Sequence, residues 1–244
     1  MAQSGRVRDG VRVDDAEADR EAGRPVGRRA FVVGVGLGVS SLWWGDRLLQ
    51  AASAASQALP AAVRAALPVG DEWRIYAVNP PFPRFSAASW RLRIDGMVER
   101  PQSLSLTDLQ RLPRVEQISD FHCVTGWSVP DVRWGGVRFA DLLALAAPRS
   151  QARALIFESA EEPYVDALTL RQLRAPGAML ATHMDGEPLS RAHGAPVRVV
   201  MPQMFGYKGV KWLRRITVSD RAPAGYWEQR GYDRDAWIDG ARRS

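Results

Sequence analysis

From about residue 60 onward, apolar positions occur in short runs that are separated by turn residues. Residues 90–94 alternate between polar and apolar side chains, which predicts a strand, and Asp95-Gly96 predicts a turn after it. Further strands are expected at residues 154–157, 178–180, 197–201 and 210–218, with Asp185-Gly186 as another turn. Residues 107–112 and 140–147 predict short helices that end at Pro113 and Pro148.

These elements do not follow a regular strand–helix–strand alternation. The pattern therefore favours an α+β, mainly β fold over a doubly wound parallel sheet. The sequence contains no GxGxxG motif, so a Rossmann dinucleotide domain is not expected. We predict one domain over residues 60–244.

The chain before this domain has a different pattern. Residues 1–29 are rich in charge and hold almost no large apolar side chain, which predicts a disordered leader. Arg28-Arg29 precede the uncharged residues 30–45, and these would form a helix of about 24 Å, shorter than the roughly 30 Å hydrocarbon core of a bilayer. Small residues at 51–56 then offer cleavage sites.

This order predicts a twin-arginine export signal within residues 1–54, although Gly27 stands where Ser or Thr is usual. We expect an exported, periplasmic or extracytoplasmic protein whose signal is either cleaved or retained as a membrane anchor. A chance arginine pair before a buried helix is the alternative.

The amino-acid composition limits the partners and the kinds of site that we expect. The chain has 244 residues, 46% of them hydrophobic, and a net charge of +6 from 33 basic and 27 acidic side chains. The basic residues are scattered and do not form an aromatic-interleaved stripe, so nucleic acid is not an expected partner. A single cysteine, Cys123, excludes an internal disulfide and a four-cysteine metal site.

Four interpretations of Cys123 remain open from the residues alone. It could be a small buried residue, or a nucleophile with His183 or His193 as its base, because His122 would point to the opposite face of a strand. Zinc bound by this cysteine and histidines is a weak match to known ligand spacing. The fourth interpretation is one soft thiolate that completes the coordination of a metal whose other sulfurs come from a cofactor.

A second group of residues has the composition of an anion site. Both lysines of the chain, Lys208 and Lys211, lie in the segment 206–213, and Arg198 precedes them. Glycines such as Gly209 allow backbone N–H groups to converge on an anion, and the cations add charge. A surface hairpin with two solvated lysines would give the same pattern.

Residues 123–143 and 184–216 resemble the molybdopterin-binding domain of the sulfite oxidase superfamily, with likeness from about Asn79 to Asp220. The nearest likeness is to its small bacterial members, the methionine sulfoxide reductases. The resemblance implies that Cys123 is the one protein ligand of molybdenum in a molybdenum–molybdopterin cofactor. It also implies cofactor contacts from these residues: Asn79, Ser159, His193, Arg198, Lys208, Gly209, Val210 and Lys211.

Two positions depart from the pattern of these reductases. His193 stands where they have Asn, and His122 stands before the cysteine where they have Arg. The second change alters the charge beside the metal, and we expect His122 to take part in catalysis by donating a hydrogen bond or proton. A role for His183 is not predicted.

The resemblance implies two-electron oxygen-atom transfer at molybdenum. We expect reduction of an S-oxide or N-oxide with electrons from a separate membrane or soluble redox protein. The alternatives are sulfite oxidation and, in a different class, a cofactor-free thiol hydrolase. The sequence after Val218 is too short for the dimerisation domain of full sulfite oxidases, so a monomer is expected.

Overall fold

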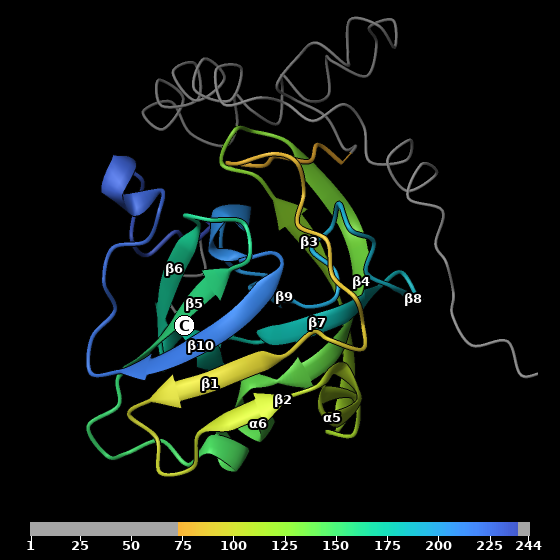
Figure 1. The fold of residues 1–244 in the computed structure, drawn as a ribbon. Coiled ribbons are helices and arrows are strands. Elements are labelled where there is room, and N and C mark those ends of the chain that lie inside the picture. Colours follow the sequence, from red (N-terminus) through yellow and green to blue (C-terminus); the bar gives the residue numbers. More distant parts are fainter. Residues whose placement is uncertain (1–72, 239–244) are drawn as a thin grey trace, which may run out of the picture.

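The computed structural model describes residues 73–238, and the predicted leader and signal in residues 1–54 lie outside them (Figure 1). The strands are β1 Leu92–Gly96, β2 Gln102–Leu104, β3 Arg114–His122, β4 Ser128–Arg138, β5 Ala154–Ser159, β6 Val165–Thr169, β7 Met179–Met184, β8 Glu187–Pro188, β9 Arg198–Val200 and β10 Leu213–Ser219. The helices are α5 Leu106–Gln110 and α6 Phe139–Ala146, with short 3-10 helices η2 Gln172–Arg174, η3 Gly206–Lys208 and η4 Glu228–Arg230.

The strands form two sheets. The first has the order β2-β1-β10-β5-β6, and its β1 and β10 pair in parallel, with Arg93 opposite Arg215. The second has the order β3-β4-β7-β8, with β9 paired to β7. Antiparallel neighbours dominate both sheets, which confirms the mainly β, α+β prediction.

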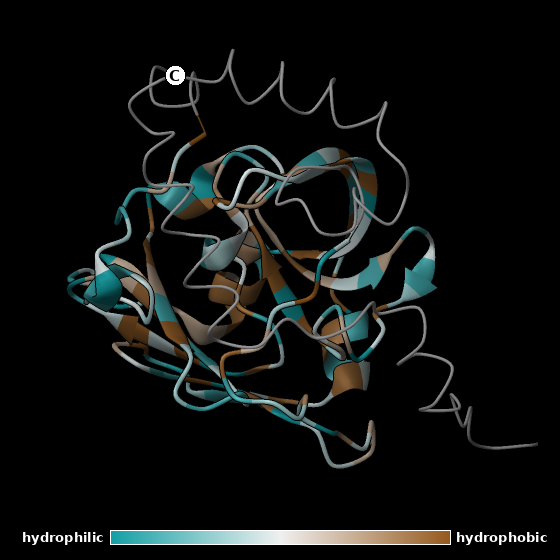
Figure 2. Ribbon diagram, turned by 90° about the horizontal axis from the view of Figure 1, so that it is seen from above, coloured by the Kyte–Doolittle hydropathy of each residue, from teal (hydrophilic) through white to brown (hydrophobic). Residues whose placement is uncertain are grey.

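The main core lies between the two sheets and α6. Leu92 and Ile94 of β1, Ile216 of β10 and Leu180 of β7 are fully buried within one cluster, which Leu142 of α6 also joins. Alternate residues of β1, β5 and β10 point into this core, and hydrophobic and hydrophilic segments alternate along strands in Figure 2.

A smaller cluster covers the other face of the second sheet. Its members are Val132, Trp134, Met179, Ala181, Leu189 and Val200. In β7, Leu180 faces the main core while Met179 and Ala181 face this cluster, as the two-residue period of a strand requires. Strand β7 is therefore buried on both faces and makes a fixed base for the loops near it.

Both predicted helices are present with shifted bounds. Ser105 caps α5, accepting from the Asp108 backbone N–H, while the Asp108 carboxylate accepts from the Ser105 backbone N–H. This reciprocal pair explains why so short a helix forms before Pro113. Helix α6 ends at Ala147, which adopts a left-handed backbone conformation.

Strands overlap the predicted segments at 154–157, 178–180, 197–201 and 210–218, and Asp185-Gly186 turns between β7 and β8. The expected turn at Asp95-Gly96 is wrong, since both residues belong to β1 and pair with Thr217 and Val218. No helix within the described residues is long and apolar enough to cross a membrane.

Candidate functional site

A cavity opens where the ends of several strands and loops meet. It contains about 900 Å³ of empty space, part of it open to solvent. Its walls come from residues 73–78, the turn between β3 and β4, the turn between β5 and β6, and the loops around β9 and η3. The lining residues used below are Trp73, Tyr76, Phe121, Cys123, Trp127, Glu161, His193, Arg198, Tyr207, Gly209, Lys211 and Trp227.

Cys123 lies in the tight turn that joins β3 to β4. Its backbone N–H donates to Trp127 O at 2.9 Å, and its carbonyl accepts from Gly126 N at 3.0 Å. Gly126 has φ +93°, a conformation that favours glycine, so this residue closes the turn. The turn holds the Cys123 side chain against the cavity, as the sequence predicted for a strand that meets a loop.

The Cys123 side chain is half-buried in the wall of the cavity. Burial raises its pKa, while a hydrogen bond with Thr125 opposes the rise, and the two side-chain atoms are 3.1 Å apart. The partner of the sulfur is a hydroxyl rather than an imidazole. This arrangement does not activate a free thiol nucleophile, because a higher pKa leaves less thiolate at neutral pH.

A second loop places His193 and Lys211 on the opposite wall. Gly194 has φ +101°, and a Cβ built on it would lie 2.8 Å from Lys211 Cβ. Trp212 N–H donates to Gly194 O at 3.2 Å. The motif around residues 193–198 therefore needs glycine at its second position, because only glycine lets the backbone pass this close to Lys211.

Three basic side chains line the cavity, of which Arg198 is buried and His193 and Lys211 are half-buried. Burial lowers the pKa of Arg198 to about 10. Burial also lowers the pKa of Lys211 to about 7, against the attraction of Glu161 and with added repulsion from Arg198. For His193, burial and the positive charges of Arg198 and Lys211 lower the pKa to about 3, so its ring is neutral at pH 7.

Two polar atoms of this group are buried without a partner among the described residues, namely Arg198 Nε and His193 Nδ1. Leaving such an atom unpaired costs about 1–3 kcal/mol, so native sites rarely keep one without a reason. Unpaired donors and mutually repelling cations both favour an anion in the cavity. The residues present thus fit an anionic cofactor that approaches Cys123, Arg198 and Lys211.

Residues 73–79 form one side of the cavity and are held in place by hydrogen bonds with Lys211 and Glu161. Lys211 Nζ donates to Tyr76 O at 2.7 Å. One oxygen of Glu161, Oε1, accepts from Val78 N at 2.6 Å and from Asn79 N at 3.1 Å. Glu161 was not predicted from the sequence, and its signal there is only a pair of acidic residues before Pro163.

Of the predicted site residues, the structure brings Cys123, His193, Arg198, Gly209 and Lys211 to one cavity. Others lie beside it without lining it. The Asn79 amide donates to Glu162 O, and Ser159 Oγ donates to Lys211 O at 2.7 Å, so Ser159 supports the lysine from behind.

The other two histidines also lie outside the lining. His122 Nδ1 is 2.8 Å from Ser128 Oγ across the β3–β4 pair, and His183 Nδ1 is 2.8 Å from Thr182 Oγ1. His122 follows the strand alternation and points away from Cys123, as the two-residue period requires. Its expected catalytic role therefore lacks a direct contact with the cavity.

The structure does not place Lys208 and Val210 at the cavity, where the sequence predicted cofactor contacts for them. Lys208 is fully buried, and its ammonium is paired with Asp166 and Glu228 rather than facing the cavity. Val210 is fully buried in the main core. The short turn η3 directs Lys208 and Lys211 to opposite sides, and spacing alone could not distinguish them.

The structure adds Tyr232, which the sequence did not predict. Its hydroxyl is buried without a partner among the described residues, and its ring contacts Tyr207 with centroids 5.3 Å apart. Burial and the neighbouring Cys123 raise the pKa of Tyr232 to about 12, so the phenol keeps its proton. Tyr232 therefore keeps a buried hydrogen-bond donor next to Tyr207 in the cavity wall.

No group of three or more His, Cys, Asp or Glu residues suited to a metal ion occurs in residues 73–238. A metal at Cys123 would therefore need its further ligands from a bound group. This agrees with the fourth interpretation of the cysteine.

Fold and site together define a molybdopterin-type oxidoreductase domain. Residues 79–227 match the family model described as "Oxidoreductase molybdopterin binding domain". The chain belongs to this family, and it is a molybdopterin-dependent oxidoreductase.

Similar proteins also support the assignment of this chain to the family. The oxidoreductase YuiH of Bacillus subtilis is 40% identical over 143 residues, which cover 59% of this chain and 72% of YuiH. The methionine-sulfoxide reductase catalytic subunits MsrP of Campylobacter jejuni and Gluconobacter oxydans are 30% and 33% identical, each over 59% of this chain. The chain spans about half the length of these two subunits, 54% and 52%.

A solved structure has the same fold. The sulfane dehydrogenase SoxCD of Paracoccus pantotrophus superposes with a TM-score of 0.54 and 27% identity. The match covers 57% of this chain and 40% of that chain. It confirms the predicted sulfite-oxidase-type fold.

Proposed function

We propose that this chain binds molybdenum–molybdopterin and reduces an S-oxide or N-oxide by two-electron oxygen-atom transfer. The observation that carries the proposal is a cavity lined by a solitary thiol, by Arg198 and Lys211, and by two buried polar atoms, Arg198 Nε and His193 Nδ1, without a partner among the described residues. The resemblance to two methionine-sulfoxide reductase subunits favours an S-oxide as substrate.

Each lining residue has a role in this proposal. Cys123 would supply one thiolate to molybdenum, and the higher pKa of the free thiol means that binding must release its proton. Arg198 and Lys211 would hold the anionic tail of the cofactor, with the backbone of Gly209 beside them. His193, neutral at pH 7, would contribute a hydrogen bond from Nδ1 or to it.

The bound cofactor would supply a two-electron redox centre that exchanges an oxygen atom with the substrate. The protein's own contribution is orientation and the exclusion of water. Trp73, Phe121 and Trp127 pack against one another with ring centroids 4.9–6.2 Å apart and form an apolar wall beside Cys123. Tyr232 would donate a hydrogen bond to an oxygen atom near the sulfur, because its proton is retained.

The proposal also includes the source of the electrons and the location of the protein. A separate redox protein, in the membrane or soluble, would supply the electrons. We also propose export by the twin-arginine route to the periplasm or another extracytoplasmic space, on the basis of Arg28-Arg29 and the apolar residues 30–45. Export would be tested by fusing residues 1–54 to a reporter and replacing both arginines with lysine, which should leave the reporter in the cytoplasm.

One experiment separates the proposed activity from the alternatives. The protein is purified from a host that makes molybdopterin, its molybdenum content is measured, and turnover is tested with sulfoxides and N-oxides plus a reduced dye. Sulfite oxidation, the second candidate, is favoured by the likeness to a sulfane dehydrogenase and is tested with an oxidised dye. Stoichiometric molybdenum with reduction of an oxide supports the proposal. Hydrolysis without any metal would support the thiol hydrolase and reject the proposal.

A further inference from the structure

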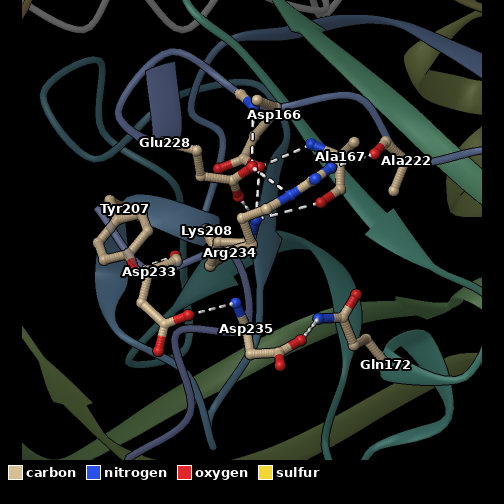
Figure 3. Close-up of polar contacts among 12 residues, drawn as sticks. Asp166, Ala167, Gln172, Tyr207, Lys208, Ala222, Glu228, Asp233, Arg234 and Asp235 are labelled. Atoms are coloured by element: carbon tan, nitrogen blue, oxygen red, sulfur yellow. Dashed lines mark hydrogen bonds and ion pairs between the residues drawn. The ribbon is translucent and has the colours of Figure 1, made fainter. Parts of the chain in front are cut away.

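Lys208 lies in a buried ionic cluster outside the cavity (Figure 3). Its Nζ donates to Asp166 Oδ1 at 2.6 Å, to Ala167 O at 3.1 Å and to Glu228 Oε1. An ammonium group has three hydrogens, and these three contacts use all of them. Lys208 therefore has no donor left for a cofactor, and its role must lie in what it holds together.

The cluster joins the sheet to residues 225–238, which we call the C-terminal segment. Asp166 belongs to β6, and Glu228 begins η4 in the C-terminal segment. The second oxygen of Glu228, Oε2, accepts from Gly225 N at 3.0 Å. Lys208 thus bridges two carboxylates that come from different parts of the chain, and loss of the bridge would leave two buried negative charges close together.

Other contacts fix the C-terminal segment at its far end. Tyr207 Oη donates to Asp233 O at 2.6 Å, and Phe205 N donates to Ala236 O at 2.9 Å. Tyr207 is the neighbour of Lys208 in η3, so one short turn holds both ends of the C-terminal segment.

The C-terminal segment brings two aromatic residues to the site. Trp227 lines the cavity, and Tyr232 has a buried hydroxyl and a ring that packs against Tyr207, another lining residue. Their rings contact each other with centroids 5.2 Å apart. Between them lie η4 and the exposed Gly231, and the backbone N–H of Tyr232 donates to Trp227 O at 3.2 Å, so the two residues move as one unit with η4.

We propose that Lys208 is a positioning residue that, through Glu228, holds the C-terminal segment so that Trp227 stays in the cavity wall and Tyr232 stays packed against Trp227 and Tyr207. This inference rests on the proposed function where turnover is concerned, since Tyr232 acts there on the substrate oxygen. The position of the C-terminal segment itself does not depend on that function, and it can be measured separately.

The first test measures how well Cys123 is covered. Because Cys123 is the only cysteine of the chain, a thiol-reactive dye labels one site. In full-length protein made without molybdopterin, Glu228→Gln should raise the labelling rate about tenfold by loosening the C-terminal segment. Glu99→Gln, which breaks an exposed ion pair with Arg149, is the matched control and should leave the rate unchanged.

Trypsin gives a second measure of the same change. Arg230 and Arg234 are exposed in the C-terminal segment, and cleavage after them should become about tenfold faster in Glu228→Gln. If Glu228→Gln does not fold, Glu228→Asp, which shortens the side chain that reaches Lys208, serves in its place. Unchanged labelling and cleavage in the folded variant would overturn the proposal.

The turnover test separates positioning from general destabilisation. In the molybdenum-loaded enzyme, Glu228→Gln and Tyr232→Phe should each lower kcat about tenfold. Their combination should be no worse than Tyr232→Phe alone, because both changes remove the same contribution. Additive losses would reject action through Tyr232. Absence of oxide turnover in the unaltered enzyme would instead reject the proposed function, while the labelling result would still decide the position of the C-terminal segment.

Discussion

Gly194 lies directly against Lys211, with only 2.8 Å between a Cβ built on the glycine and the Cβ of the lysine. The glycine also has φ +101°. Gly194→Ala should therefore lower the free energy of unfolding by about 2–5 kcal/mol, from the left-handed backbone and the close contact together. Urea denaturation of the purified variant measures this change.

Gly186→Ala is the matched control for that variant. Gly186 has a similar φ of +89°, but no atom lies within 4 Å of its Cβ position. It should lose only about 1–2 kcal/mol, the backbone cost alone. Equal losses in the two variants would show that the contact with Lys211 does not constrain the loop.

Cys123→Ser should reduce turnover by about a hundredfold or more, because a hydroxyl is a poor substitute for a soft thiolate at molybdenum. Molybdenum content and steady-state rates should be measured on the same preparation. Glu99→Gln, on an exposed ion pair, should keep the rate within about twofold. A Cys123→Ser variant with full activity would reject this residue as the metal ligand.

Arg198→Lys should lower cofactor occupancy by about tenfold or more. The change keeps a positive charge but removes Nε and the planar pair of donors, and one charge-assisted hydrogen bond contributes about 1.5–3 kcal/mol. Occupancy is measured as bound pterin per protein after purification. Arg171→Lys, on an exposed side chain, should retain full occupancy; equal loss in both variants would contradict a specific role for Arg198.

Anion binding should depend on pH through Lys211. Its pKa of about 7 in the cofactor-free chain means that the ammonium is charged below pH 7 and loses its proton as the pH rises. An anion favours the charged form. Sulfate affinity should therefore be constant below about pH 6 and fall by up to about tenfold per pH unit above 7.

Sulfate suits this titration because its own charge does not change over the range. Trp212 gives the signal, since Lys211 Nζ lies 4.2 Å from the centroid of its ring. Over the same range His193 stays neutral and Arg198 stays charged. Lys211→Met should bind sulfate more weakly and without this pH dependence. The same slope in the variant would exclude Lys211 as the titrating group.

Much of the site could be predicted because its chemistry is concentrated in two short motifs. Cys123 is followed by Gly126, and His193, Arg198 and Lys211 lie within one loop–strand–loop stretch, so local spacing brings them near each other. The structure confirms that these residues share a cavity. Lys208 could not be separated from Lys211 in this way, because only the direction of the turn at η3 decides which lysine faces the cavity.

Other parts of the site depend on long-range packing. Trp227, Glu161 and Trp73 come from segments with no periodic pattern, and only the assembled sheets place them at the cavity. Strand β3 was not predicted over its full length, because Gln117 and Ser119 occupy inward positions where apolar residues are expected. Ile118 is an apolar residue on the outward face of β3 and is 58% exposed. The strand therefore lacks the alternation of apolar and polar positions from which it could be predicted.

The parallel pairing of β1 with β10 also governs when the cavity can exist. Arg93 cannot meet Arg215 until the chain between them has left the ribosome, and the walls built from both ends of the domain form only then. A chain that is still being translated therefore lacks the complete cavity. Under the proposed function, the cofactor would therefore be inserted only after the whole domain has been translated.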